Sequence, residues 1–443
     1  MPTSAYRDQV RRLYGLLSEQ LYLGRPDFHL EGEAANSTLL FALLTALVGG
    51  KALIIGEPGL GKTTAAEYVG ALVYGLPLGV IWSGEVAGHP EQTEEKIVGR
   101  PHLGKLNQGE EAVVWSCFAR LPVKIVDEIN RLPETKQSLV LDGLDRGKWE
   151  YLNQTLVNDE YCLFATANYQ DQGTNTLIPP LLDRFDVLVE AKHPGANLAF
   201  VIGQWGSRAE LLRHAASEAA FMAALHRSAD GLETVLEQTR RRFAAVLRQR
   251  CGLSPLSRRQ RQAIRAEIQS LPLDLEANAF VRAVLAELSF CCKYGQKRSI
   301  DVCEEGCHYT GYLCYEVRNC ASNRLPSSIY RYAQALAWWL GRSQVAVEHV
   351  RAVLPYTLAH RLQWREAYLA ARERERRQEP LLLHAARQAT AAVFRRFYEQ
   401  RHALLQALST AARIYDGEDL PLPQGDHPLY AEIRRDLGQD EPW

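Results

Sequence analysis

The stretch GEPGLGKTTAAEYVG, residues 56–70, constrains the fold of this chain more than any other. An apolar run, KALIIG, precedes it, and alanines and a glutamate that suit a helix follow it. Gly56, Gly61, Lys62 and Thr63 match the pattern G-x-x-x-x-G-K-[ST], which needs a strand before it and a helix after it. Such a loop turns backbone N–H groups toward a phosphate, and the helix N-terminus adds a partial positive charge. The stretch therefore predicts a phosphate-binding loop in an α/β fold.

We expect this loop to bind ATP. Lys62 would bridge the β- and γ-phosphates, and Thr63 would bind Mg²⁺. The expected nucleotide-binding residues of the loop are Gly56, Glu57, Pro58, Gly59, Leu60, Gly61, Lys62, Thr63 and Thr64.

A second motif, VKIVDEINR, ends an apolar run in the acids Asp127 and Glu128. If the run is a strand of a parallel sheet, both carboxylates lie at the carboxyl edge, where ligands bind in open α/β sheets. Asp127 can bind the magnesium, and Glu128 can orient and activate the attacking water. The alternative is that the two acids simply begin the next helix.

A third motif is FATANYQDQGTNTLIPPLLDRFD, residues 164–186. Asn168 closes a buried strand, so its amide could reach the γ-phosphate or the attacking water. Arg184 ends a short helix and could be offered to the nucleotide of a neighbouring subunit. Arginine suits that role because its planar guanidinium stays charged and matches phosphate oxygens.

The spacing of apolar runs predicts the fold class and the domains. The runs ALIIG, GVIWSG, PVKIVDE, YCLFATAN and FDVLVEA alternate with helical patterns, which is typical of a parallel sheet covered on both faces. Asn36 and a glycine bracket a further predicted helix, STLLFALLTALV. We expect a helical lead-in over 1–35, an α/β core over 36–193, an all-helical lid over 194–365 with a cysteine-rich insert at 291–320, and a helical C-terminal extension over 366–443.

Composition and the length of the apolar runs argue against a membrane-spanning protein and against a disulfide-linked secreted protein. The 443 residues carry a formal net charge of -1 and are 47% hydrophobic, which indicates a soluble globular protein of two or three domains. The longest apolar run, LLFALLTALV, is too short to span a bilayer. Nine cysteines without a secretion signal predict reduced thiols in a cytoplasm.

Four motifs together resemble those of the MoxR-like AAA+ ATPases, ring ATPases with an insert in helix 2 of the core. They are GEPGLGKT, IVDEINR, ATANYQDQGTNTLIPPLLDRFD and RSQVAVEHVRAVL, and they occur in the family's order. The resemblance covers residues from about 35 to 365 and implies a P-loop AAA+ core. It makes residues 56–63 Walker A, Asp127 and Glu128 Walker B, Asn168 sensor 1 and Arg184 the arginine finger.

The resemblance also implies a second sensor in the lid. Arg324, in SNRLPSSIYRYAQALAWWLGR, matches the family's position for sensor 2, and Arg331 is the competing choice. Arg131 either faces a subunit boundary or is an exposed structural residue. Residues 83–115 match the helix-2 insert but lack a strong aromatic pore loop, so threading of a polypeptide through the ring stays open.

Six of the nine cysteines lie between Cys291 and Cys320. A short, polar segment of this kind buries little apolar surface, and four thiolates around zinc would stabilise it. The preferred ligands are Cys292, Cys303, Cys307 and Cys314; Cys291, Cys320 and His308 are alternative ligands. Free thiols and an iron–sulfur cluster are the competing interpretations.

The function predicted from these features is Mg²⁺-dependent ATP hydrolysis by a ring of six that remodels or matures a client. The resemblance implies a partner with a von Willebrand factor A domain. The alternative is a nucleic-acid-dependent motor or a nucleotide-gated defence component that uses the nine arginines of residues 240–265. That segment would otherwise be a helical pair with solvated arginines. A third hypothesis is a scaffold that binds ATP to assemble and hydrolyses it slowly.

Overall fold

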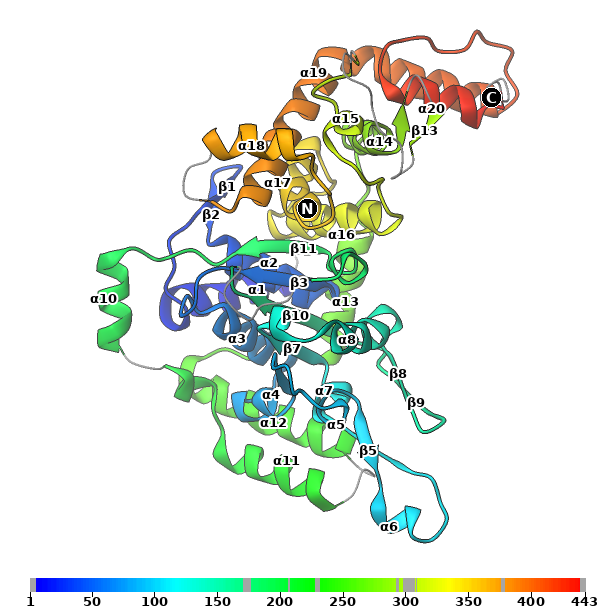
Figure 1. The fold of residues 1–443 in the computed structure, drawn as a ribbon. Helices are drawn as coiled ribbons and strands as arrows, with labels where there is room; N and C mark the ends of the chain where they lie inside the picture. Colours follow the sequence, from blue (N-terminus) through cyan, green and yellow to red (C-terminus); the bar gives the residue numbers. More distant parts are fainter. Residues whose placement is uncertain are drawn as a thin grey trace. The chain divides into compact units, whose positions relative to one another are not determined.

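The computed structural model describes residues 5–169, 177–205, 208–227, 232–291, 295–297, 307, 309–375 and 379–438 (Figure 1). The chain forms two compact units. The first comprises Met1–Gln269 and Trp339–Gly341, and the second comprises Ser270–Trp338 and Arg342–Trp443. The domain borders predicted from the sequence, after residues 193 and 365, do not coincide with the border between these units and stay predictions.

The first unit is built on a five-stranded sheet in the order β11-β3-β10-β7-β4. Every neighbouring pair is parallel. The strands are β3 (Lys51–Ile55), β4 (Glu85–Ala87), β7 (Val123–Asp127), β10 (Cys162–Ala167) and β11 (Val187–Glu190). All six residues of the central strand β10 are buried, as expected for a parallel strand covered on both faces. The predicted α/β P-loop fold is confirmed.

One predicted strand is wrong. The run GVIWSG lies in helix α4 (Leu78–Ser83), and the strand β4 begins two residues after that helix ends. Pro77 precedes the helix and Gly84 follows it, and both residues are common at helix boundaries. A short apolar run has no periodicity that distinguishes a buried strand from a buried helical turn.

Helices α2 (Ser37–Val48) and α3 (Lys62–Tyr74) pack side by side on the sheet, α2 on β3, β10 and β11, and α3 on β7 and β10. Their ends follow the sequence signals. The Asn36 side chain accepts a hydrogen bond from the Leu39 amide, and Gly49 ends α2 with φ of 66°. The left-handed backbone at the end of a helix favours glycine.

The N-terminal lead-in is only partly helical. It contains α1 (Ala5–Leu16), η1 (Leu17–Leu21) and a two-stranded sheet of β1 (Phe28–Leu30) and β2 (Glu33–Ala35). The other elements of the first unit are α5 (Glu94–Ile97), β5 (Gly99–Pro101), α6 (Leu103–Leu106), β6 (Val113–Trp115), α7 (Cys117–Arg120), η2 (Ile129–Arg131), α8 (Glu134–Arg146), β8 (Lys148–Tyr151), β9 (Gln154–Val157), α9 (Pro179–Leu182), α10 (Ala196–Trp205), η3 (Ala209–Leu212), α11 (Ala215–Arg227), α12 (Leu232–Cys251) and α13 (Arg258–Gln269).

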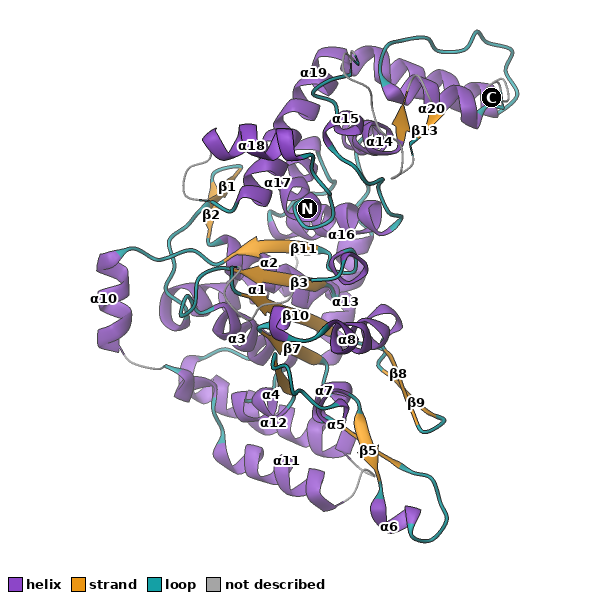
Figure 2. Ribbon diagram, viewed as in Figure 1, coloured by secondary structure: helices purple, strands orange, loops and turns teal. Residues whose placement is uncertain are grey.

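The second unit is mainly helical (Figure 2). Its elements are α14 (Leu275–Ser289), β12 (Phe290–Cys291), β13 (Gly295–Gln296), α15 (Leu313–Glu316), α16 (Arg324–Trp339, whose last residue lies in the first unit), α17 (Val347–Leu358), α18 (Glu366–Glu375), α19 (Leu381–Tyr415) and α20 (Pro428–Asp436). Helix α14 packs against α17, α19 and α20. The Phe280 ring contacts those of Phe394 and Phe397, so the C-terminal helices share one core with α14.

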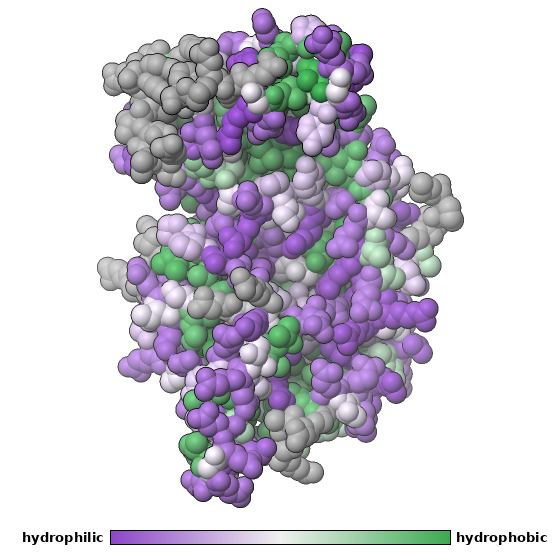
Figure 3. Space-filling view, turned by 90° about the vertical axis from the view of Figure 1, so that its right-hand side faces the viewer, coloured by the Kyte–Doolittle hydropathy of each residue, from purple (hydrophilic) through white to green (hydrophobic). Residues whose placement is uncertain are grey.

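Hydrophilic residues predominate on the face shown in Figure 3, where apolar residues form small scattered groups. Within the described part of the chain, every helix is either too short or too polar to cross a membrane.

Candidate active site

Two glycines shape the loop between β3 and α3. Gly56 has φ of 153°, and a Cβ there would lie 2.7 Å from the Ala191 carbonyl oxygen. Gly61 has φ of 71°, and its Cβ would lie 3.1 Å from the ring of Tyr22. The Tyr22 hydroxyl also donates to the Leu60 carbonyl at 3.3 Å. Larger residues would strain the backbone or collide at both positions, so glycine keeps the loop close to its neighbours.

The middle of the loop is open to solvent. Glu57, Pro58 and Gly59 are exposed, and α3 begins at Lys62 directly behind them. The unpaired amides of the first helical turn therefore face the loop and favour an anion there. This arrangement fits the phosphates of a nucleotide.

Lys62 is the buried cation of the loop. Its Nζ donates to the carbonyl oxygens of Gly56 at 3.0 Å and Glu57 at 2.8 Å, and to Asn168 Oδ1 at 2.7 Å. Burial lowers the pKa of Lys62, and the carboxylates of Asp127, Glu128 and Glu57 act in the opposite direction. Lys62 and Asn168, predicted from separate motifs, are thus in direct contact.

Asp127 and Thr63 come together at the same edge. Thr63 Oγ1 donates to Asp127 Oδ1 at 2.5 Å, and Thr166 Oγ1 donates to the same oxygen at 2.5 Å. Magnesium prefers oxygen ligands of this kind, often one or two carboxylates beside substrate phosphates. The residues present therefore fit a Mg²⁺ ion held by Thr63 and Asp127.

Glu128 is held at both carboxylate oxygens. Oε1 accepts from Asn168 Nδ2 at 2.6 Å, and Oε2 pairs with Arg131 Nε at 2.9 Å. Its backbone is left-handed, with φ of 49° and ψ of 48°, and its amide donates to Thr166 Oγ1 at 2.9 Å. A Cβ on Gly88 would lie 2.0 Å from the Glu128 carbonyl oxygen. Strained backbone of this kind collects at functional sites.

A second carboxyl pair lies near this edge. Glu67 on α3 and Glu85 on β4 share a hydrogen bond, and Trp82 Nε1 donates to Glu67 at 2.7 Å. Burial, then the charges of Glu67 and Asp127, raises the pKa of Glu85 to about 8. The raised pKa favours a shared proton in this pair, which limits the negative charge beside Asp127.

Several residues around the site were not predicted, among them Thr166, Asn130 and Tyr22. Thr166 is fully buried and contacts both acids, Asn130 donates to the Asn168 carbonyl at 3.2 Å, and Tyr22 covers the loop. Thr166 carries a weak sequence signal, because it is a polar residue within a buried apolar run. Asn130 lies in a polar turn that follows the two acids, and nothing in the sequence sets it apart. Tyr22 has no such signal, since its contact joins distant parts of the chain.

Arg184 lies near the amino ends of the strands, on the side of the sheet opposite the loop. The Asp186 amide donates to the Lys51 carbonyl at 2.8 Å, and Val187 is in register with Ala52. Arg184 is therefore beside the start of β3, whereas the loop follows its end. At about 3.3 Å per residue, the two are separated by roughly 16 Å. Arg184 is not brought to the loop of its own chain.

The predicted lid residues belong to the second unit. Arg324 is the first residue of α16, and Arg331 lies within the same helix. Among the preferred zinc ligands, Cys314 is buried and Cys307 is partly exposed, whereas Cys292, Cys303 and the alternative His308 lie outside the described residues. Over the described ranges, no three histidine, cysteine or acidic side chains cluster in a way that could hold a metal ion.

The basic segment of residues 240–265 is partly internal. Arg261 is 1% exposed, pairs with both oxygens of Glu160 at 2.8 and 3.2 Å, and donates to the Val73 and Leu256 carbonyls. Burial lowers the pKa of Arg240. Several of these arginines therefore stabilise the fold, and the segment as a whole is not an open basic face.

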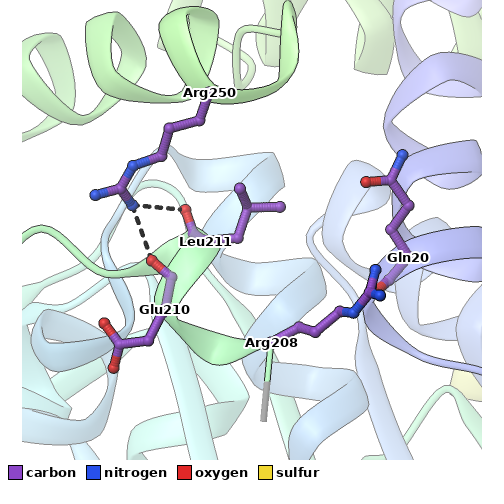
Figure 4. Close-up of a pocket in the computed structure, with 5 residues that line it drawn as sticks. All are labelled: Gln20, Arg208, Glu210, Leu211 and Arg250. Carbon is purple, nitrogen blue, oxygen red and sulfur yellow. Dashed lines mark hydrogen bonds between the residues drawn. The ribbon is translucent and has the colours of Figure 1, made fainter. Parts of the chain in front are cut away.

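A pocket of about 490 Å³ has no residue of the loop in its lining (Figure 4). It is lined by Gln20, Arg208, Glu210, Leu211 and Arg250. In Figure 4 the Arg250 guanidinium reaches the carbonyl oxygens of Glu210 and Leu211, at 2.8 and 3.2 Å. Arg250 thus satisfies carbonyls of η3, which is a structural role.

Two family models match the chain. The model of the AAA domain of the dynein-related subfamily matches residues 51–185, and that of the AAA lid domain matches residues 319–383. The first spans the loop, both acids, Asn168 and Arg184, and the second spans Arg324. The chain therefore contains an AAA+ ATPase domain and an AAA lid domain over these residues. The two matches agree with the AAA+ core and the lid that the resemblance implies.

Among solved structures, the chain is similar to a protein from Cytophaga hutchinsonii ATCC 33406 described provisionally as an ATPase. The identity is 17% and the TM-score 0.58, over 88% of this chain and 94% of that chain. It also matches a full-length MCM homolog from Methanopyrus kandleri, at 14% identity and a TM-score of 0.42, over 81% of this chain and 61% of that chain. No curated protein matches the sequence.

Proposed function

We propose that this ATPase works as a ring, most simply a hexamer, in which Arg184 of one copy completes the nucleotide site of the next. The single observation that supports this is the position of Arg184. It lies near the amino ends of the strands β11 and β3, whereas the loop follows the carboxyl end of β3. A trans guanidinium can contribute ~10³–10⁵ in rate in related phosphoryl transfers. The energy of hydrolysis then remodels, activates or matures a client.

The residues at the edge have complementary roles in this proposal. Lys62 would bind the β- and γ-phosphates. Thr63 and Asp127 would hold a Mg²⁺ ion, which would supply positive charge to neutralise the phosphates. Glu128 accepts a proton from the attacking water. Asn168 and Arg131 each hold one oxygen of Glu128, and each oxygen keeps a second lone pair that can accept from the water. Arg324 on α16 is the proposed sensor 2.

The partner is proposed from the resemblance, namely a client associated with a von Willebrand factor A domain. A nucleic-acid-dependent role is less well supported, because Arg261 and several neighbouring arginines bind groups of this chain. Stimulation of ATP turnover by DNA or RNA, falling steeply with salt, would favour that role instead.

Zinc at Cys292, Cys303, Cys307 and Cys314 stays part of the proposal. The described neighbours form a short hairpin of β12 and β13, and the Cys320 thiol donates to the Lys297 carbonyl at 2.8 Å. Elemental analysis of the purified protein tests the zinc proposal, and a zinc-free protein with full ATPase activity would exclude the zinc.

The ring proposal is tested by mixing two inactive variants. Arg184→Ala keeps an intact loop but offers no arginine, and Glu128→Gln keeps the arginine but loses the base. Each alone should bind ATP and hydrolyse it poorly. If the arginine acts in trans, a random equal mixture restores about a quarter of the sites. Turnover no greater than the sum of the separate variants would contradict the proposal.

A further inference from the structure

Helix α8 connects three features of the first unit. It follows η2, which carries Arg131, and it leads directly into the β8–β9 hairpin, which extends away from the sheet in Figure 1. It also contacts α9, the helix that precedes Arg184. Helix α8 thus adjoins η2 and the β8–β9 hairpin along the chain and has contacts with the hairpin and with α9.

Gln137 fixes α8 to the chain on both sides. Its side chain is fully buried. Nε2 donates to the Leu132 carbonyl at 3.0 Å, just after η2, and Oε1 accepts from the Ile178 amide at 3.1 Å, just before α9. A buried amide with both ends paired resists displacement, because breaking either bond leaves an unsatisfied polar group.

The base of the hairpin is packed onto the same helix. The Trp149 ring of β8 is 2% exposed and lies so close to Gly143 of α8 that a Cβ there would be 2.3 Å from it. Trp149 Nε1 donates to Asn158 Oδ1 at 3.1 Å, and the Asn158 amide donates to the Gly147 carbonyl at 2.8 Å. The hairpin base is therefore packed closely against α8.

Asp145, in the last turn of α8, contacts Arg184. Its Oδ1 lies 3.4 Å from Arg184 Nε, and Arg184 also donates from a terminal nitrogen to the Pro180 carbonyl at 2.8 Å. The Arg184 side chain is only 19% exposed. One contact comes from α9, the helix just before Arg184, and one comes from α8, so the direction of the guanidinium depends on where α8 lies.

We propose that Asp145 is a positioning residue for Arg184, and that α8 transmits displacement of the β8–β9 hairpin to that arginine. The inference rests on the proposed function, in which Arg184 acts on the neighbouring site. A client that pulls on the hairpin of one copy thereby changes hydrolysis in the next. Misplacement of about 1 Å can cost ~10²-fold in rate, so a modest shift of α8 is sufficient.

The test uses the full-length assembled protein and the substitution Asp145→Asn, which keeps the shape and removes the charge. The expected result is a fall in kcat of ~10–100-fold with little change in ATP binding or thermal stability. Asp145→Glu should recover part of the loss. The matched control is Glu150→Gln. Glu150 is a carboxylate of the β8–β9 hairpin that pairs with Lys148, and its substitution is expected to leave turnover unchanged.

The two residues are then combined in a double-mutant cycle. If Asp145 acts through Arg184, Asp145→Asn causes no further loss in the Arg184→Ala background. An equal loss in both backgrounds would overturn the inference, and so would unchanged kcat in Asp145→Asn alone. If Arg184→Ala itself leaves turnover unchanged, the proposed role of Arg184 in the neighbouring site is wrong. This result is obtained without any change at Asp145, so it is distinguished from a failure of the inference about Asp145.

Discussion

At the residue scale, one hydroxyl joins the two acids of the active site. Thr166 Oγ1 donates to Asp127 Oδ1 and accepts from the Glu128 amide, and the residue is fully buried. It therefore helps to hold the left-handed backbone that aims Glu128. Its place in the sheet is predictable from the apolar run, but this double contact depends on the register between β10 and β7.

We expect Thr166→Val, which keeps the size and removes the hydroxyl, to leave the Glu128 amide unpaired in the protein interior. The free energy of unfolding should fall by about 1–3 kcal/mol, and kcat should fall with it. Denaturant unfolding and ATP turnover measure the two effects. Thr166→Ser keeps the hydroxyl and is the control, so equal losses in both variants would show that the hydrogen bonds are unimportant.

At the element scale, the sequence predicts what local chemistry determines. Asn36 and Gly49 bracket α2 because capping acts within a single turn, and the loop motif places β3 and α3 on either side of it. The misassigned run of α4 shows the limit, because its helix is selected by burial against distant residues. Gly143 shows the same limit. In the sequence of α8 it is only a residue that weakens a helix, and the reason for a glycine there is the Trp149 ring, which leaves no room for a Cβ.

Gly143→Ala tests that explanation through the sign of its effect. Replacing glycine by alanine in a helix normally stabilises by about 1 kcal/mol. Here the new methyl would meet the Trp149 ring at 2.3 Å, so we expect a lower melting temperature. Gly203→Ala is the matched control, because Gly203 lies in α10 and its Cβ would have no neighbour within 4 Å. Stabilisation by both substitutions would refute the packing argument.

At the scale of the whole molecule, the C-terminal extension is part of the folded second unit. Glu287 of α14 is fully buried, and Arg396 of α19 pairs with both of its oxygens at 2.6 and 3.0 Å. His427, just before α20, is also buried and lies 3.5 Å from the same carboxylate. The sequence could not rank the roles of this tail, because the three residues are far apart along the chain.

Burial alone would raise the pKa of Glu287, but its contacts with His427 and Arg396 hold the pKa below its ordinary value. A carboxyl with a lowered pKa stabilises the folded state above its unfolded pKa, and this contribution is lost as the pH falls through the folded pKa. The second unit should therefore lose stability in acid. The contacts of Glu287 with Arg396 and His427 join α14 to α19 and to the residue just before α20.

Arg396→Met should remove the cation and leave a buried, uncompensated carboxylate, which typically costs ~3–5 kcal/mol. We expect denaturant unfolding of the second unit to shift accordingly at neutral pH. The deficit should shrink toward about pH 4, because protonation then relieves the isolated charge. Adding Glu287→Gln should recover part of the loss. Arg413→Met is the control, since Arg413 pairs with Glu418 at an exposed surface and such pairs contribute little. If both arginine variants unfold alike, the buried cluster does not hold the C-terminal helices, and their shared apolar core alone keeps them on α14.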